Sequence, residues 1–164
     1  MTAALGAASV AVPAVGGPAP DFELVNQYGE PVRLSMFRGR NVVLVFFPFA
    51  FSGICTGELG AIRDNMALFE ESNSAVLAVS VDSKFSLRTY AGQEGYAFEL
   101  LADFWPHGAV ATLYGVFDAE SGMAQRGTFI IDAGGTIRYS VVNPRGEARD
   151  FGEYRKALAG LGKA

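Results

Sequence analysis

The chain has 164 residues, 50% of them hydrophobic and 18% charged, with a formal net charge of -4 at pH 7. This length and composition predict a soluble globular domain with a substantial core and exclude a disordered chain. The negative charge argues against nucleic acid or an anionic membrane as the main partner. Cys55 is the single cysteine, which excludes an intramolecular disulfide, so nothing requires an oxidising compartment. The longest apolar run, residues 42–51, includes a proline and is too short to span a bilayer.

The N-terminal segment is rich in small residues and contains no Lys or Arg before residue 18. We interpret residues 1–17 as a flexible tail and residues 18–164 as the folded domain. A secretory signal begins with a basic segment, so its absence predicts a cytoplasmic protein.

Strands and helices are expected to alternate along the domain. Residues 42–47 are apolar throughout, which is typical of a strand covered on both faces, and residues 75–81 (AVLAVSV) are expected to form a second buried strand. The other expected elements are a hairpin over 22–34, a helical turn at 35–38, a helix over 84–94 that begins after Ser83, a strand at 98–101, a short helix ending near 114, a hairpin of 127–132 with 136–142, and a helix over 147–161. This order predicts an α/β, thioredoxin-like fold, in which a central mixed β-sheet is flanked by helices.

The helix expected after residue 52 carries the cysteine. One helical stripe repeats at steps of four, three, four and three residues, and consists of Cys55, Leu59, Ile62, Met66 and Phe69. Cys55 therefore lies on the buried stripe, in the first turn of this helix.

A lone cysteine is most often a small buried hydrophobic residue. At a helix start, however, free backbone N–H groups and the helix dipole favour a thiolate. Pro48 forces the chain to leave the preceding strand, and Gly53 and Gly57 leave space near the sulfur. These features favour a reactive cysteine.

The segment PFAFSGIC, residues 48–55, resembles the peroxiredoxin signature PxxxTxxC or PxxxSxxC. Three segments, FFPFAFSGICTGEL, DFWPHGAV and RGTFIID, are similar in particular to the one-cysteine alkyl hydroperoxide reductase E group of actinobacteria. The resemblance extends from Ala19 to the C-terminal helix. It implies a thiol-specific peroxidase that reduces hydrogen peroxide and organic hydroperoxides, with peroxynitrite as a further candidate.

The resemblance also implies roles for individual residues. Cys55 would be the peroxidatic cysteine, oxidised to a sulfenic acid. Ser52, in place of the commoner Thr, would hydrogen bond to the peroxide and the sulfur, and Pro48 would shield the sulfur from water. Arg126 would hold the thiolate and polarise the O–O bond. Glu58 either pairs with this arginine or compensates the helix dipole, and both interpretations stay open.

The single histidine, His107, offers the alternative of a Cys–His pair, as in cysteine hydrolases. No accompanying Asn or Asp pattern supports that pair, so a role at a helix start or an interface is favoured. Phe104 and Trp105 are expected to pack near the site or at a subunit contact. The sequence predicts no metal site, and the resemblance implies no cofactor.

Because the chain has no second cysteine, the sulfenic acid must react with an external thiol. The resemblance suggests mycothiol, mycoredoxin or a thioredoxin-like protein as the reductant, and a homodimer or larger assembly. Two alternatives remain. A thioredoxin-type carrier should show CxxC, but Glu58 stands three residues after Cys55. A redox sensor or holdase-like binding protein would use the same fold without turnover.

Overall fold

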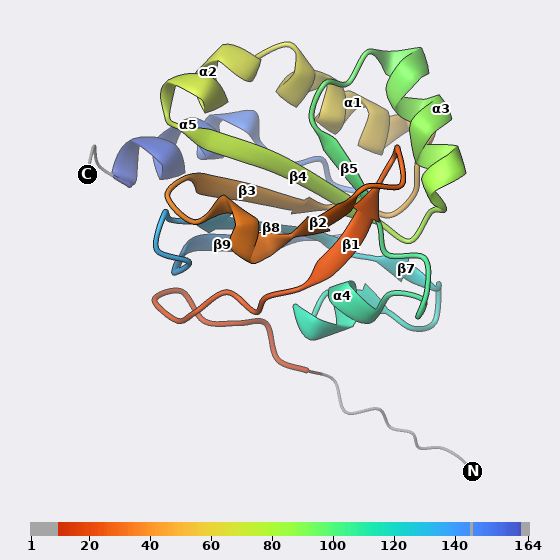
Figure 1. The fold of residues 1–164 in the computed structure, drawn as a ribbon, viewed down its shortest axis with the longest axis horizontal. Coiled ribbons are helices and arrows are strands. Elements are labelled where there is room, and N and C mark those ends of the chain that lie inside the picture. The colour runs from red at the N-terminus through yellow and green to blue at the C-terminus, as the bar shows by residue number, and fades with distance from the viewer. Residues whose placement is uncertain (1–9, 145, 162–164) are drawn as a thin grey trace.

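The computed structural model describes residues 10–144 and 146–161. A central sheet of seven strands has the order β2-β1-β5-β4-β3-β8-β9 in this part of the chain (Figure 1). These strands are β1 (Glu23–Asn26), β2 (Pro31–Arg33), β3 (Asn41–Phe46), β4 (Ser74–Ser80), β5 (Glu99–Ala102), β8 (Arg126–Ile131) and β9 (Ile137–Asn143). The helices are η1 (Leu34–Phe37), α1 (Gly53–Arg63), α2 (Met66–Glu71), α3 (Lys84–Glu94), α4 (Ala109–Leu113) and α5 (Phe151–Gly160).

Two hydrophobic cores lie on the two faces of the sheet. Helices α1, α2, α3 and α5 cover one face, and α4 packs on the other (Figure 1). Alternate residues of β3 point to opposite faces, so Val43 and Val45 enter the first core while Leu44 and Phe46 enter the second. This explains why the central strand is apolar throughout.

The strand directions place the end of β3 beside the beginning of β8. Strands β3, β4 and β5 run parallel, whereas β8 is antiparallel to β3. In this register Val42 pairs with Ile131 and Val45 pairs with Thr128. The first residue of β8, Arg126, therefore lies near the loop that leads from β3 into α1.

The predicted α/β fold with a mixed, helix-flanked sheet is confirmed, with three local differences. The single helix expected after residue 52 is divided, because α1 ends at Arg63 and α2 begins at Met66. Phe69 nevertheless remains in the same core as Leu59, so the stripe is preserved across the break. A small hairpin of β6 (Phe117–Asp118) and β7 (Met123–Ala124) was not predicted.

The last helix begins four residues later than the predicted residue 147. The carboxylate of Asp150 accepts a hydrogen bond from Gly152 N at 2.9 Å and caps the helix at that point. Residues 147–150 are thus a connecting segment, and this leaves Arg149 free to turn inward.

Of the predicted tail, residues 1–17, the first nine lie outside the described residues. Its last two residues hydrogen bond to the start of β9: Gly16 N donates to Ile137 O at 2.7 Å, and Ile137 N donates to Gly17 O at 2.9 Å. Among the described residues no helix is long and apolar enough to cross a membrane.

Candidate active site

Cys55 lies in the first turn of α1, at the C-terminal end of β3. Its fractional exposure is 0%, and it packs in the core that the four helices cover. Ser52 is the residue before the helix, and its carbonyl accepts the hydrogen bond from Thr56 N at 2.9 Å. The Ser52 hydroxyl does not cap the helix but donates to Phe49 O at 3.2 Å. The early N–H groups of the helix are therefore left without a side-chain cap beside the sulfur.

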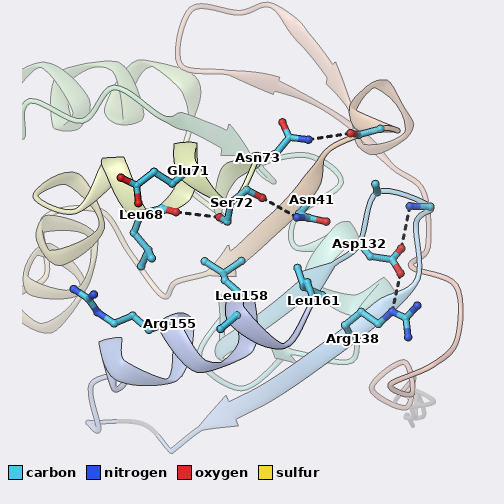
Figure 2. A pocket seen from close by; sticks show the side chains of 14 residues that line it. Asn41, Leu68, Glu71, Ser72, Asn73, Asp132, Arg138, Arg155, Leu158 and Leu161 are labelled. Atoms are coloured by element: carbon cyan, nitrogen blue, oxygen red, sulfur yellow. Dashed lines mark hydrogen bonds and ion pairs between the residues drawn. The ribbon is translucent and has the colours of Figure 1, made fainter. Parts of the chain in front are cut away.

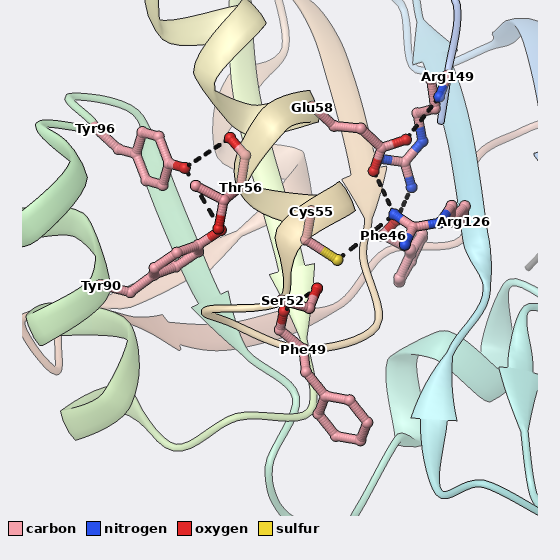
Figure 3. Close-up of polar contacts among 10 residues, drawn as sticks. All are labelled: Phe46, Phe49, Ser52, Cys55, Thr56, Glu58, Tyr90, Tyr96, Arg126 and Arg149. Carbon is pink, nitrogen blue, oxygen red and sulfur yellow. Dashed lines mark hydrogen bonds and ion pairs between the residues drawn. The ribbon is translucent and has the colours of Figure 1, made fainter. Parts of the chain in front are cut away.

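Arg126 supplies a positive charge directly at the sulfur. Its Nη1 donates to Cys55 Sγ at 3.5 Å and to Glu58 Oε1 at 2.5 Å (Figure 3). Arg126 has the same orientation in β8 as Ile130, which belongs to the core beneath α1. The alternation of the strand thus directs this guanidinium toward the cysteine.

Glu58 joins two arginines one turn after the cysteine. Its side chain is only 3% exposed, and its Oε2 accepts a hydrogen bond from Arg149 N at 2.7 Å. Arg149 Nη1 lies 3.3 Å from Glu58 Oε1, and Arg149 Nη2 donates to the carbonyl of Phe46 at the end of β3 (Figure 3). Of the two interpretations of Glu58, this geometry favours the one in which it pairs with Arg126.

Arg149 is the residue of this site that sequence reasoning missed. The helix expected over 147–161 would include residue 149 and gives it no role in the site. A signal for its true position was present, because Asp150 directly precedes Phe151 in the pattern of an N-cap. That signal moves Arg149 out of the helix, although it does not reveal the contact with Glu58.

Asp82 holds the loop between β3 and α1 against the end of β4. Its Oδ2 accepts hydrogen bonds from Ala50 N at 2.8 Å and from the Ser80 hydroxyl at 2.6 Å. Pro48 lies at the start of this loop and, together with Arg126, lines a cavity of about 290 Å³. A Cβ atom added at Gly53 or at Gly57 would meet no atom within 4 Å, whereas Cys55 itself is fully buried, so the expected space near the sulfur stays a prediction.

A larger cavity, of about 770 Å³, lies away from the cysteine (Figure 2). Asn41 lines it at the beginning of β3, whereas Cys55 follows the end of that strand. Arg138, Arg155 and Leu158 form other parts of its wall. Cys55, Glu58, Arg126 and Arg149 do not line this cavity.

His107 contacts a different part of the molecule. Its Nε2 lies 2.8 Å from Gly122 O, and its ring packs edge-on against Phe117 at a centroid distance of 5.9 Å. The side chain of His107 therefore connects the loop before α4 to the β6–β7 hairpin, which fits the predicted role at a helix start. Trp105 is 82% exposed. No group of three or more His, Cys, Asp or Glu side chains is arranged as a metal site within the described residues.

Comparisons with known proteins place the chain among the peroxiredoxins. The AhpC/TSA family model matches residues 15–140. The chain is 49% identical over 148 residues to "Alkyl hydroperoxide reductase E" of Mycobacterium tuberculosis, a match that covers 90% of this chain and 97% of that protein.

Two solved structures are similar over most of their length. AhpC of Enterococcus faecalis has a TM-score of 0.80 at 31% identity, with 90% of this chain and 91% of that chain covered. Peroxidoxin BcpB of Mycobacterium tuberculosis has a TM-score of 0.79 at 31% identity, with 90% of this chain and 95% of that chain covered. The chain therefore belongs to the AhpC/TSA family, and it is a peroxiredoxin with a single cysteine.

Proposed function

We propose that this peroxiredoxin reduces hydrogen peroxide and organic hydroperoxides at Cys55 and is then recycled by an external thiol. Arg126 carries the proposal, because its Nη1 lies 3.5 Å from the sulfur of the chain's single cysteine. The name of the relative from Mycobacterium tuberculosis supports an alkyl hydroperoxide as one substrate class. Peroxynitrite is a further candidate substrate.

In the first step the Cys55 thiolate donates an electron pair to the distal oxygen of ROOH. The S–O bond forms as the O–O bond breaks, the alkoxide takes up a proton and leaves as ROH, and Cys55 becomes a sulfenic acid. Negative charge develops on the leaving oxygen, and the N–H groups of Arg126 would stabilise it there. Ser52 would turn its hydroxyl from Phe49 O to the peroxide, while Pro48 would limit the access of water.

In the second step an external thiol attacks the sulfenic sulfur. Water leaves, and Cys55 forms a mixed disulfide with this thiol. A second thiol then releases Cys55, so that two thiols and one ROOH give one disulfide, ROH and water. The single cysteine supports this requirement for an external reductant.

The identity of that reductant and the assembly of the protein belong to the same proposal. Mycothiol, mycoredoxin or a thioredoxin-like protein would recycle the enzyme in the cytoplasm. Domain 18–164 would pair as a homodimer or a larger assembly. Exposed aromatic side chains support such a contact surface, among them Phe49 and Trp105.

The test measures peroxide consumption with dithiothreitol as the reductant. Cys55→Ser is expected to abolish consumption, and Arg126→Lys to slow the oxidation of Cys55 by about 100-fold, because one positioned donor is lost. Arg138→Lys is the matched control, since Arg138 is an exposed cation paired with Asp132. Sustained activity in Cys55→Ser, or a single turnover without steady state in the wild type, would contradict the proposal; the latter would indicate a sensor.

A further inference from the structure

The first turn of α1 has to move if an external thiol is to reach Cys55. The cysteine has no exposed surface, whereas disulfide formation brings two sulfurs to about 2.05 Å. The attacking molecule is larger than a peroxide, so part of the structure that covers the sulfur has to open to admit it. Whatever holds this turn closed therefore influences the recycling step.

Side-chain capping does not hold the turn. Ser52 makes no hydrogen bond to the N–H groups of α1, and the first turn contains no acidic residue. Tyr90 of α3 contacts the turn instead, with its hydroxyl 3.0 Å from Thr56 Oγ1 (Figure 3). Thr56 is the residue directly after Cys55, so this contact fixes the helix on one side of the sulfur.

A second tyrosine extends the contact. Tyr96 donates from its hydroxyl to Thr56 O at 3.3 Å and approaches Tyr90 Oη at 3.4 Å. Both rings are buried. Burial raises the pKa of Tyr90 and that of Tyr96, so both hydroxyls remain protonated at physiological pH.

The ring of Tyr90 also holds the loop on the other side of the cysteine. It packs against Phe51 at a centroid distance of 4.9 Å. Phe51 has a φ of 71°, a left-handed conformation that is strained for a residue with a bulky side chain. The contact with Tyr90 is thus one of the interactions that maintain a strained loop directly before α1.

We propose that Tyr90 is a positioning residue that holds both the Phe51 loop and the first turn of α1 closed over Cys55. Its hydroxyl sets how often the sulfur becomes exposed to a thiol of low molecular weight. The recycling part of this inference rests on the proposed function, but exposure of the sulfur can be measured without any peroxide.

The experiment compares Tyr90→Phe and Thr56→Val with the control Tyr114→Phe. Tyr114 has a buried ring and donates to Pro20 O at 2.6 Å, but it packs on the other face of the sheet. The rate at which N-ethylmaleimide labels reduced Cys55 is measured together with urea unfolding. Tyr90→Phe and Thr56→Val are each expected to raise the labelling rate about fivefold, the effect of one typical hydrogen bond. The double variant should gain little more, because both changes remove the same contact.

Tyr114→Phe is expected to lose stability without faster labelling. An unchanged labelling rate in Tyr90→Phe, or an equal increase in Tyr114→Phe, would overturn the role of Tyr90. A second measurement follows reduction of preformed sulfenic acid by 2-mercaptoethanol, which should accelerate by the same factor as labelling. Faster labelling without faster reduction would overturn the link to recycling. If peroxide produced no sulfenic acid, the proposed function would fail, and labelling would still decide the role of Tyr90.

Discussion

At the scale of single residues, the site is a buried arrangement of charges around one sulfur. Glu58 lies between the guanidinium groups of Arg126 and Arg149, while Cys55 receives a hydrogen bond from the first of them. Two cations therefore face one carboxylate and one sulfur. With a thiolate at Cys55, the two positive charges would be matched by two negative charges. The carboxylate keeps the two arginines together despite their mutual repulsion.

We predict that Glu58→Gln destabilises the folded protein by about 3 kcal/mol, because it leaves two buried cations without their anion. Urea unfolding of the reduced protein measures the loss. The control is Glu23→Gln, which breaks an exposed pair with Arg33 and should leave stability unchanged within error. Equal losses in the two variants would show that the buried carboxylate does not hold the site together.

The residues of the site differ in how far the sequence could predict them. Pro48, Ser52 and Cys55 stand within one short segment, so a local motif identifies them together. Arg126 was predicted through the family resemblance, and the alternation of β8 explains why it faces the cysteine. Arg149 approaches from the connecting segment before α5, and no periodic pattern describes such a segment.

At the scale of elements, aspartates organise two of the turns that shape the molecule. Asp82 fixes the loop before α1, as described above. Asp132 organises the turn between β8 and β9, where its Oδ1 accepts from Gly134 N at 3.0 Å and Thr136 N at 2.9 Å. Arg138 Nε donates to the other carboxylate oxygen at 2.7 Å. This turn connects β8, the strand that carries Arg126, to its antiparallel neighbour β9.

The Asp132 turn is expected to lose stability in acid. Partial burial alone would raise the pKa of Asp132, but hydrogen bonds from Thr136 N and Arg138 outweigh burial and hold this pKa below its ordinary value of 3.8. The folded state therefore binds the proton more weakly than the unfolded state. The contribution of the ionised Asp132 carboxylate to stability is complete above the pKa of the unfolded state. It is lost as the pH falls through the lower pKa of the folded state.

Asp132→Asn tests this sign. The variant keeps one oxygen for the backbone donors but loses the charge, so we expect a loss of about 1 kcal/mol at neutral pH. The difference from wild type should stay constant above about pH 5 and shrink below the ordinary aspartate pKa. Urea unfolding from pH 7 to pH 3 measures it. A difference that grows on acidification would contradict the lowered pKa.

Elements were predictable where a long apolar pattern determined them, and less so at their ends. The buried strands β3 and β4 follow from continuous apolar runs. The break between α1 and α2 was not visible, because the stripe continues through it with helical spacing. Asn65 Nδ2 donates to Ala61 O at 2.8 Å and helps to end α1, a local contact that hydrophobic periodicity does not report.

At the scale of the whole molecule, the register of one strand pair decides whether the site exists. The pairing of Val45 with Thr128 brings the beginning of β8 beside the end of β3. A shift by one residue would turn Arg126 to the opposite face of the sheet, away from α1. Both faces of β3 and β8 are buried in the two cores, so the packing of these cores also determines where the guanidinium lies.

The packing of α5 provides a test of how strongly the site depends on the core. Leu158 is a buried residue of α5 and lies in the same core as Phe69 and Tyr154, whereas the described contacts of Arg149 are with Glu58 and Phe46. We predict that Leu158→Ala costs about 2–3 kcal/mol of stability, because it leaves a cavity at the helix interface. Urea unfolding measures this loss.

The rate of Cys55 oxidation by hydrogen peroxide should nevertheless stay within about twofold of wild type, because a protein with several kcal/mol in reserve remains folded after this loss. The site would then be held by its own ion pairs, and α5 would contribute by placing residue 149 at its start. The contrary result is an oxidation rate that falls tenfold or more in Leu158→Ala at a temperature where the variant is still folded. It would mean that the packing of α5 determines the position of Arg149 and, through Glu58, that of Arg126 at the sulfur.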